Sequence, residues 1–421
     1  MPVGRRARSI AIGVVAGAVS VLGPAGQAAA TEGQTPVGDV RRVVFVGNNW
    51  AGTADILAPG TFDKLGTINI IPDREERMQE IATNPERLAY FLAIREAIGE
   101  GNDQYVDDMY SSNDGRLMIV SRPSFADVVA ISLETGDIVW RFPVAGHRSD
   151  HMAISPDGQK VVVSASTGDV VHVLRVSDGE ELGQFPSGGS PHENVFIDGG
   201  DKIIHASIGM VYTPLDQPAM DTTKGERVLQ IVDANTYEIL RRYDLRAALD
   251  EHGLEDFSTA VRPMTLSPNE QKIYFQVSFF HGFLEMDRSS GKIERVKRLP
   301  NLVPDMPREQ YVLDSAHHGI AMNPEGTKIC VAGTMSDYAT VVDRSSYRTG
   351  KLLKREDGKP YGVTPSWDGD YCYISWSGTD QVSKISYRTG RIVDTAKVGD
   401  HPQRVRNAFV EQSLVDGLPQ G

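Results

Sequence analysis

The chain has 421 residues, of which 40% are hydrophobic and 24% are charged, and its formal net charge is −13. This composition predicts a globular protein with enough apolar side chains for a large core. An acidic chain without clusters of lysine and arginine is poorly suited to bind phosphate groups, so we exclude a nucleic-acid partner.

The first thirty residues have the pattern of a secretory signal peptide. A pair of arginines at positions 5 and 6 precedes an apolar run over residues 10–22, which is too short to span a bilayer. Small residues lead up to Ala30 at the usual cleavage position. We therefore predict that residues 1–30 are removed and that the protein is secreted or held in the cell envelope, with no transmembrane segment. The arginine pair leaves both the Sec and the twin-arginine export routes open.

Residues 31–40 are expected to form a disordered linker, and a repeated pattern of strands and turns follows. In each copy a short strand leads through a Pro-Asp-Gly-like turn into a second strand, and two further strands follow. Complete copies begin at Asp108, Asp150, His192, Pro263, Gly319 and Gly362. Where the spacing is tight it is about forty residues, the period of a four-stranded propeller blade.

A seventh copy is split between the two ends of the chain. Residues 41–71 contain its last three strands, and residues 401–410 form a lone first strand. Joining them closes the ring and removes the exposed sheet edges that an open array would have. We therefore predict an all-β, seven-bladed β-propeller over residues 41–412, closed by its C-terminal strand and followed by a flexible tail over residues 413–421.

Long insertions interrupt the repeat at positions that should all open on one face, the top face. They cover residues 73–101, 210–227, 245–260 and 299–314, and the first has helical spacing of apolar residues. Because rigid scaffolds place function on loops, we expect short helical insertions that cover a functional pocket on this face. Simple packing of the insertions on a stable ring remains the alternative.

The entrance of each first strand is polar and should face the central channel near the top. These positions hold Asp107, Asp108, Asp150, His151, His192, Glu193, Arg262, His317, His318, Tyr361, Gln403 and Arg404. Adjacent residues in a strand point to opposite faces, so Glu193 is expected to orient a neighbouring side chain rather than share a ligand with His192.

A second alignment adds one more histidine to this region. The turn before the third strand holds an aspartate in five blades, at Asp55, Asp127, Asp169, Asp337 and Asp380. Their carboxylates are expected to accept hydrogen bonds from backbone N–H groups of the turns. In the fifth blade the equivalent residue is His281, which should therefore open on the top face.

Two interpretations of the polar ring remain open. In the first, a divalent transition metal binds to neutral imidazoles, with candidate ligands His151, His192, His281, His317 and His318. In the second, the histidines hydrogen-bond across blade gaps and to channel water. Other ligand contacts are expected from Asp108, Asp150, Glu193, Arg262, Tyr361 and Arg404, with Arg262 or Arg404 holding an anionic substrate. His172 and His205, within strands, are expected to be structural.

Three turn motifs resemble the YVTN-type β-propeller repeat proteins. They are Ser-Pro-Asp-Gly at residues 155–158, Thr-Gly-Asp-Val at 167–170 and Arg-Thr-Gly-Arg at 388–391. The resemblance covers nearly the whole mature chain and implies a secreted or periplasmic seven-bladed protein, similar in fold to quinoprotein amine dehydrogenase heavy chains. Histidine metal sites around a propeller channel also occur in nitrous oxide reductase, which this chain resembles at that level only.

These observations favour a secreted, monomeric propeller that binds a small molecule, a peptide or a surface polymer through its top face. The alternative is a metal-dependent lyase or oxidoreductase with the histidine cluster as its centre. The sequence lacks a glycine-rich phosphate loop, a Gly-x-Ser-x-Gly nucleophile elbow and a haem-attachment motif.

The only two cysteines, Cys330 and Cys372, are expected on the second strands of neighbouring blades. An exported protein could pair them. They are offset by one position, however, so we expect them to face opposite ways, which disfavours a disulfide.

Overall fold

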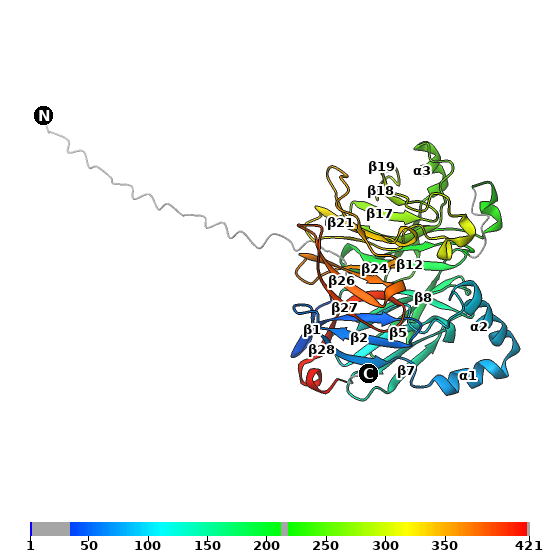
Figure 1. Cartoon of the computed structure of the whole chain (residues 1–421), viewed down its shortest axis with the longest axis vertical. Coiled ribbons are helices and arrows are strands. Elements are labelled where there is room, and N and C mark those ends of the chain that lie inside the picture. The colour runs from blue at the N-terminus through cyan, green and yellow to red at the C-terminus, as the bar shows by residue number, and fades with distance from the viewer. Residues whose placement is uncertain (2–33, 212–217, 419–421) are drawn as a thin grey trace.

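The computed structural model describes Met1 and residues 34–211 and 218–418, which form seven four-stranded antiparallel sheets (Figure 1). The predicted signal peptide therefore lies, apart from Met1, outside the described residues. Each sheet is one blade, and every blade begins where the repeat places it. The seven-bladed β-propeller is thus confirmed. In the described part of the chain, no helix has the length and apolar character needed to cross a membrane.

Blades 1 to 4 come from the first part of the chain, except for β28, which lies at the C-terminal end and completes blade 1. Blade 1 contains β28 (Pro402–Glu411), β1 (Val40–Asn48), β2 (Thr53–Leu57) and β3 (Lys64–Asn69). Blade 2 contains β4 (Met109–Ser111), β5 (Leu117–Arg122), β6 (Asp127–Ser132) and β7 (Ile138–Pro143). Blade 3 contains β8 (Ser149–Ile154), β9 (Lys160–Ala165), β10 (Val170–Arg175) and β11 (Glu181–Pro186). Blade 4 contains β12 (Pro191–Ile197), β13 (Lys202–Ser207), β14 (Leu229–Asp233) and β15 (Ile239–Arg242).

The remaining three blades follow the same order. Blade 5 contains β16 (Val261–Leu266), β17 (Lys272–Val277), β18 (Gly282–Asp287) and β19 (Ile293–Arg298). Blade 6 contains β20 (Ile320–Met322), β21 (Lys328–Gly333), β22 (Tyr338–Asp343) and β23 (Leu353–Lys354). Blade 7 contains β24 (Pro360–Pro365), β25 (Tyr371–Trp376), β26 (Gln381–Ser386) and β27 (Ile392–Lys397).

The C-terminal strand closes the ring as predicted. β28 pairs with β1 in a register that runs from Val40 opposite Glu411 to Asn48 opposite Pro402. The Phe409 side chain is fully buried, and its backbone N–H donates to the Ser111 hydroxyl of blade 2 at 2.9 Å. The last strand therefore joins blade 1 to its neighbour and completes the innermost layer of the propeller.

The turn motifs of the repeat pack against the preceding blade. Gly158 has a φ of +66°, and a Cβ atom there would lie 2.0 Å from the Asn113 side-chain oxygen of blade 2. Only glycine can therefore occupy this turn without displacing its neighbour. The Ser155 hydroxyl accepts from the Lys160 backbone N–H at 2.9 Å and fixes the start of the second strand.

Two of the four long insertions form α-helices on one face, as predicted, and the insertion over residues 210–227 lies partly outside the described residues. α1 (Arg74–Thr83) and α2 (Pro85–Ala97) connect blades 1 and 2, and α3 (Leu245–Glu251) leads into blade 5. All three are drawn along the right-hand side of Figure 1. α2 begins where Asn84 accepts hydrogen bonds from two backbone N–H groups of the first turn, with proline as its first residue.

The repeated aspartates hold neighbouring loops together. Asp337 and Asp380 have φ values of +53° and +54°, and each carboxylate accepts a backbone N–H from the loop that leads into the next blade. The Asp55 carboxylate likewise accepts the Gly399 N–H at 2.8 Å. The acceptor role expected for these carboxylates is present, but in these three the N–H groups belong to loops between blades.

Cys330 and Cys372 form a disulfide, with their Cα atoms 6.4 Å apart, so our inference that opposite facing disfavours a disulfide was wrong. The blades stack face to face around the ring. A residue on one face of blade 6 therefore meets a residue on the opposite face of blade 7. The offset that turns the two cysteines to different faces of their own sheets is what brings them together.

Described residues at both ends of the chain, within the expected linker and tail, pack against the propeller. The Gln34 side chain is buried and donates to the Ser111 carbonyl oxygen at 2.9 Å. After β28 the chain forms a short 3-10 helix, η8 (Gln412–Gly417), and both Val415 and Leu418 are buried in the core of blades 1 and 2. The apolar side chains of the tail explain this packing, because exposing them to water would be unfavourable.

Candidate metal centre in the central channel

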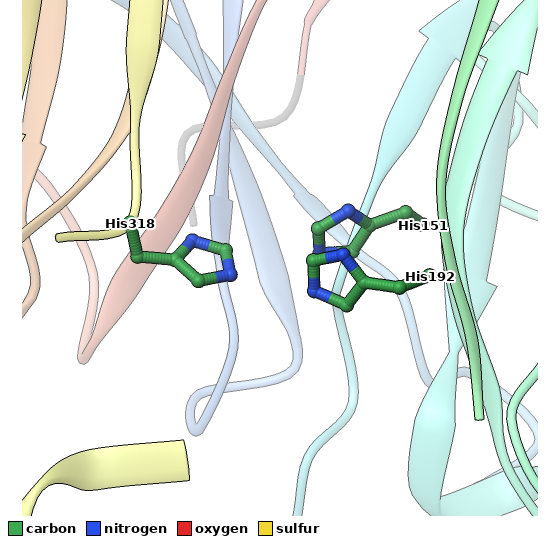
Figure 2. Close-up of side chains that lie close together, drawn as sticks. All are labelled: His151, His192 and His318. Carbon is green, nitrogen blue, oxygen red and sulfur yellow. The ribbon is translucent and has the colours of Figure 1, made fainter. Parts of the chain in front are cut away.

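Three histidines from three blades converge inside the channel. His151 lies in β8, His192 lies in β12, and His318 lies two residues before β20. One ring nitrogen from each lies within 4.8 Å of the others. Figure 2 shows His151 and His192 side by side, with His318 facing them from the opposite side of the channel. We refer to these three residues as the histidine triad.

An irregularity repeated in the first strands places these side chains. The pairing of β8 with β9 passes from Ser149 to Met152, and the pairing of β12 with β13 passes from Pro191 to Asn194. His151 and His192 each lie in the two-residue bulge that results. Bulges turn side chains away from the regular pleat and are common beside functional sites. Equivalent bulges contain Arg262 in β16 and Tyr361 in β24.

Second strands stabilise two such bulges from the adjacent blade. The Ser164 hydroxyl, opposite the bulge of β8, donates to the His192 carbonyl oxygen at 2.9 Å. The Ser375 hydroxyl donates in the same way to the Gln403 carbonyl oxygen at 2.8 Å. The strand entrances are therefore held by hydrogen bonds between blades, which leaves the histidine rings free to point into the channel.

All three members of the triad are buried and neutral. Their exposed fractions are 2%, 3% and 0% for His151, His192 and His318. Burial, followed by the positive charge of nearby arginines, lowers the pKa of each well below the ordinary value of 6.5. Neutral imidazole is the form that binds metal ions.

Several ring nitrogens in the triad have no hydrogen-bond partner among the described residues. Both ring nitrogens of His318 and Nδ1 of His192 are buried without a hydrogen-bond partner. Such groups cost free energy unless water, an ion or a ligand satisfies them. The triad therefore has donor atoms available at its centre.

His151 has partners on both sides of its ring. Its Nδ1 hydrogen-bonds to a Glu193 carboxylate oxygen at 2.7 Å, and its Nε2 is contacted by the guanidinium of Arg404. Burial raises the pKa of Glu193 to about 7. A carboxylate on the far nitrogen is the arrangement that orients metal-binding histidines in proteins. Glu193 thus orients a neighbour, as its position in the strand predicted.

Tyr361 and two aspartates complete the walls. The Tyr361 ring stacks on His318 with a centroid distance of 3.9 Å and an interplanar angle of 17°. Asp150 Oδ1 and Asp107 Oδ2 lie 3.7 Å and 4.0 Å from His151 Nε2. Together with His151 they form a second group that could hold a metal ion. Burial and the charge of Asp150 raise the pKa of Asp107.

His281 and His317 are brought together, but apart from the triad. Their ring centroids are 5.5 Å apart, and each ring nitrogen Nε2 faces a tyrosine hydroxyl, that of Tyr311 for His281 and that of Tyr338 for His317. Burial lowers the pKa of His281 to about 4 and lowers that of His317 well below 6.5. Among the described residues, neither belongs to a group of converging ligand atoms.

Two of the other expected ligand-binding residues have structural contacts. The Asp108 carboxylate pairs with Arg406 through two hydrogen bonds of 2.8 Å and accepts the Met152 backbone N–H at 3.1 Å. Arg262 donates to the Ser278 hydroxyl and to the carbonyl oxygen of Leu313. Both side chains therefore support the walls of the channel.

Sequence reasoning missed Arg148, whose guanidinium hydrogen-bonds to the Asp150 carboxylate. It is 7% exposed and lines the channel beside the triad. Arg148 lies in the loop before β8, where the pattern of strands gives no signal for the direction of a side chain.

The channel is narrow on the side of the triad that faces the insertions and wide on the opposite side. On the side of the insertions, a chamber of about 20 Å³ is bounded by His151, His192 and Asp107 and covered by Ile98, Ile208, Val211 and Leu313. On the other side, a cavity of about 340 Å³ extends along the first strands to Pro156, Gly199, Gly200 and Glu270, in the turns that join first and second strands. The insertions thus cover the site, and the wide cavity extends toward the opposite face.

Comparison with known proteins supports the fold and does not identify a family. No family model and no curated protein matches the chain. Among solved structures, 1555 chains match, so the architecture is widespread. One of them is the hydrazine synthase of Kuenenia stuttgartiensis, with a TM-score of 0.51 and 14% identity, covering 74% of this chain and 96% of that chain. At this identity the likeness shows the propeller fold alone, and the YVTN-type resemblance remains a prediction.

Proposed function

We propose that this protein binds one divalent transition-metal ion at the histidine triad and that it is a metal-dependent lyase or oxidoreductase. The observation that carries the proposal is the convergence of three buried, neutral imidazoles with unsatisfied nitrogens within 4.8 Å. Three protein ligands with an open coordination position are typical of catalytic rather than structural metal sites.

The surroundings of the triad fit such an ion. Imidazole ligands suit zinc, copper, iron and nickel, and Asp107 or Asp150 could add an oxygen ligand. His151 would use Nε2, because Nδ1 is held by Glu193. The contact from Arg404 would then have to move away from Nε2.

We also propose that the protein acts outside the cytoplasm. The predicted signal peptide suggests this, and a buried disulfide between two blades supports it, because such bonds persist in oxidising compartments.

Ligand binding without catalysis is the second candidate. The cavity of about 340 Å³ below the triad favours it, because this volume is within the range of small-molecule sites. Among the described residues, the cavity lies on the face opposite the helical insertions, so this candidate places the ligand in the channel rather than on the top face.

Metal analysis of the purified protein tests the first proposal. His318→Ala removes a triad member, and His317→Ala is the matched control because it removes an adjacent histidine that is equally buried. The wild-type protein and His317→Ala, loaded with Zn²⁺, Cu²⁺ or Fe²⁺ and then desalted, should each retain about one equivalent of the preferred ion. His318→Ala should lose it.

Thermal unfolding provides an independent measure of the same site. A ligand that binds only the folded state raises the melting temperature. Chelation should therefore lower the melting temperature of the wild-type protein and of His317→Ala, and leave that of His318→Ala unchanged. Equal metal content in the two variants, or a wild-type protein that retains no ion, contradicts the proposal.

A further inference from the structure

Arg404 is a buried cation at the boundary between the histidine triad and the wide cavity. It lies in β28, its exposed fraction is 5%, and its side chain lines the cavity. Among the residues that the structure describes, the one hydrogen bond of its side chain is to His151, its guanidinium lies 5.9 Å from the centre of the Tyr361 ring, and its Nε atom is buried without a hydrogen-bond partner. Within the described part of the chain, no carboxylate lies within ion-pair distance of this guanidinium, although Asp107, Asp108 and Glu193 lie near enough to raise its pKa. A buried charge without a direct partner is costly.

Most of the other charged groups near Arg404 already have partners. Arg406 also lines the cavity, but its guanidinium pairs with the Asp108 carboxylate. Glu193 hydrogen-bonds to His151, and Glu270 at the far end accepts the Asp198 backbone N–H at 2.7 Å. Asp107 has a carboxylate oxygen without a partner, but it lines the small chamber on the other side of the triad.

The rest of the cavity has a mixed wall, only slightly more apolar than polar. Its wall includes Ile154, Val195, Phe196, Leu266, Ile320 and Val363. A guanidinium that can form a two-pronged hydrogen bond thus lies at the inner end of a cavity with apolar side chains in its wall. Arginine in this setting is suited to a planar carboxylate or a similar anionic group.

We infer that the molecule on which this protein acts is a small amphipathic anion, whose carboxylate or like group binds Arg404 while its apolar part occupies the channel cavity. This assignment rests on the proposed function, because it names the class of substrate for the same site. The contact of Arg404 with His151 places the bound anionic end beside the triad. The substrate enters from the face with short turns, since the insertions cover the other end of the channel.

A pair of matched probes tests the inference on the wild-type protein. 3-Phenylpropanoate is an amphipathic carboxylate, and 3-phenylpropanamide has the same shape without the charge. Binding of each is measured by calorimetry or by ligand-observed NMR, with protein that has been treated with chelator. The carboxylate should bind about tenfold more tightly than the amide, as expected for a charge-assisted hydrogen-bonded pair.

Substitution of Arg404 locates the effect. Arg404→Gln should abolish the preference for the carboxylate, and Arg404→Lys should retain part of it, because lysine keeps the charge without the two-pronged geometry. Arg348→Gln removes the same charge from an exposed position and should leave the preference unchanged. Circular dichroism and melting temperature establish that each variant is folded, and the comparison of probes on the wild-type protein requires no variant.

Equal binding of the two probes to the wild-type protein, at any strength, overturns the inference. A preference that persists in folded Arg404→Gln also overturns it. Failure of the proposed function is distinguishable, because the probe measurement uses metal-free protein. A preference for the anion in a chain that retains no metal refutes the metal centre alone, and a metal-binding chain without the preference refutes the anion site alone.

Discussion

Closure of the ring by β28 can be tested with the single substitution Phe409→Ala. The Phe409 side chain is fully buried, its ring lies 5.0 Å from that of Trp367 in blade 7, and its backbone is bonded to Ser111 in blade 2. Truncation of a buried phenylalanine to alanine typically lowers the free energy of unfolding by about 3–5 kcal/mol. This is a large part of the roughly 5–15 kcal/mol by which folded proteins are usually stable.

Urea unfolding followed by circular dichroism measures the loss. With a slope of about 3 kcal/mol per molar urea for a chain of this size, the midpoint should fall by at least about 1 M. Val393→Ala is the control, because Val393 is 52% exposed on the outermost strand of blade 7 and should change stability by less than about 0.5 kcal/mol. A midpoint for Phe409→Ala that matches the control would show that β28 does not hold the ring closed.

Three further predictions concern the scaffold. Replacing Cys330 and Cys372 together by alanine should lower the free energy of unfolding by about 4 kcal/mol, because the disulfide closes a loop of 42 residues and so lowers the entropy of the unfolded chain. The urea midpoints of the oxidised wild-type protein and of the double variant test this, and equal midpoints contradict it. Burial lowers the pKa of His205 and His401 from 6.5 to about 3. As the pH falls below 6.5, these two histidines therefore become protonated in the unfolded chain while they are still neutral in the folded protein. Stability should be complete above pH 6.5 and decline toward pH 3, by about 1.4 kcal/mol per pH unit for each histidine; a urea midpoint that is constant between pH 7.5 and 5.5 refutes this. Asp337→Ala should cost about 1–3 kcal/mol, since alanine disfavours the positive φ and cannot accept the N–H of the next loop, whereas Asp337→Asn should be nearly neutral in the same assay.

The architecture could be predicted because its signals are local. A turn such as Ser155 to Gly158 depends on residues within a few positions of one another, and the alternation of apolar side chains identifies the strands around it. The split first blade followed from counting strands at the two ends. No long-range distance was needed, since a repeat of known period admits one closed arrangement.

The candidate site could be predicted only in part. The repeat placed His151, His192 and His318 at equivalent entrances, and the structure brings one nitrogen of each within 4.8 Å. The repeat did not distinguish these three histidines from His281 and His317, which pack against each other instead. The difference depends on the bulges of the first strands and on side-chain rotamers, neither of which leaves a mark in the pattern of residue types.

What the sequence by itself determined is the propeller: the number of blades, the closing strand and the face that carries the insertions. Only the tertiary structure decided which histidines converge, that Cys330 and Cys372 meet across two blades, and that Arg404 lies between the triad and a cavity. The physical reason is the separation along the chain of the residues that interact. Turns and strands are set by interactions between near neighbours in the chain, whereas the contents of the channel are set by the geometry of seven sheets packed in a closed ring.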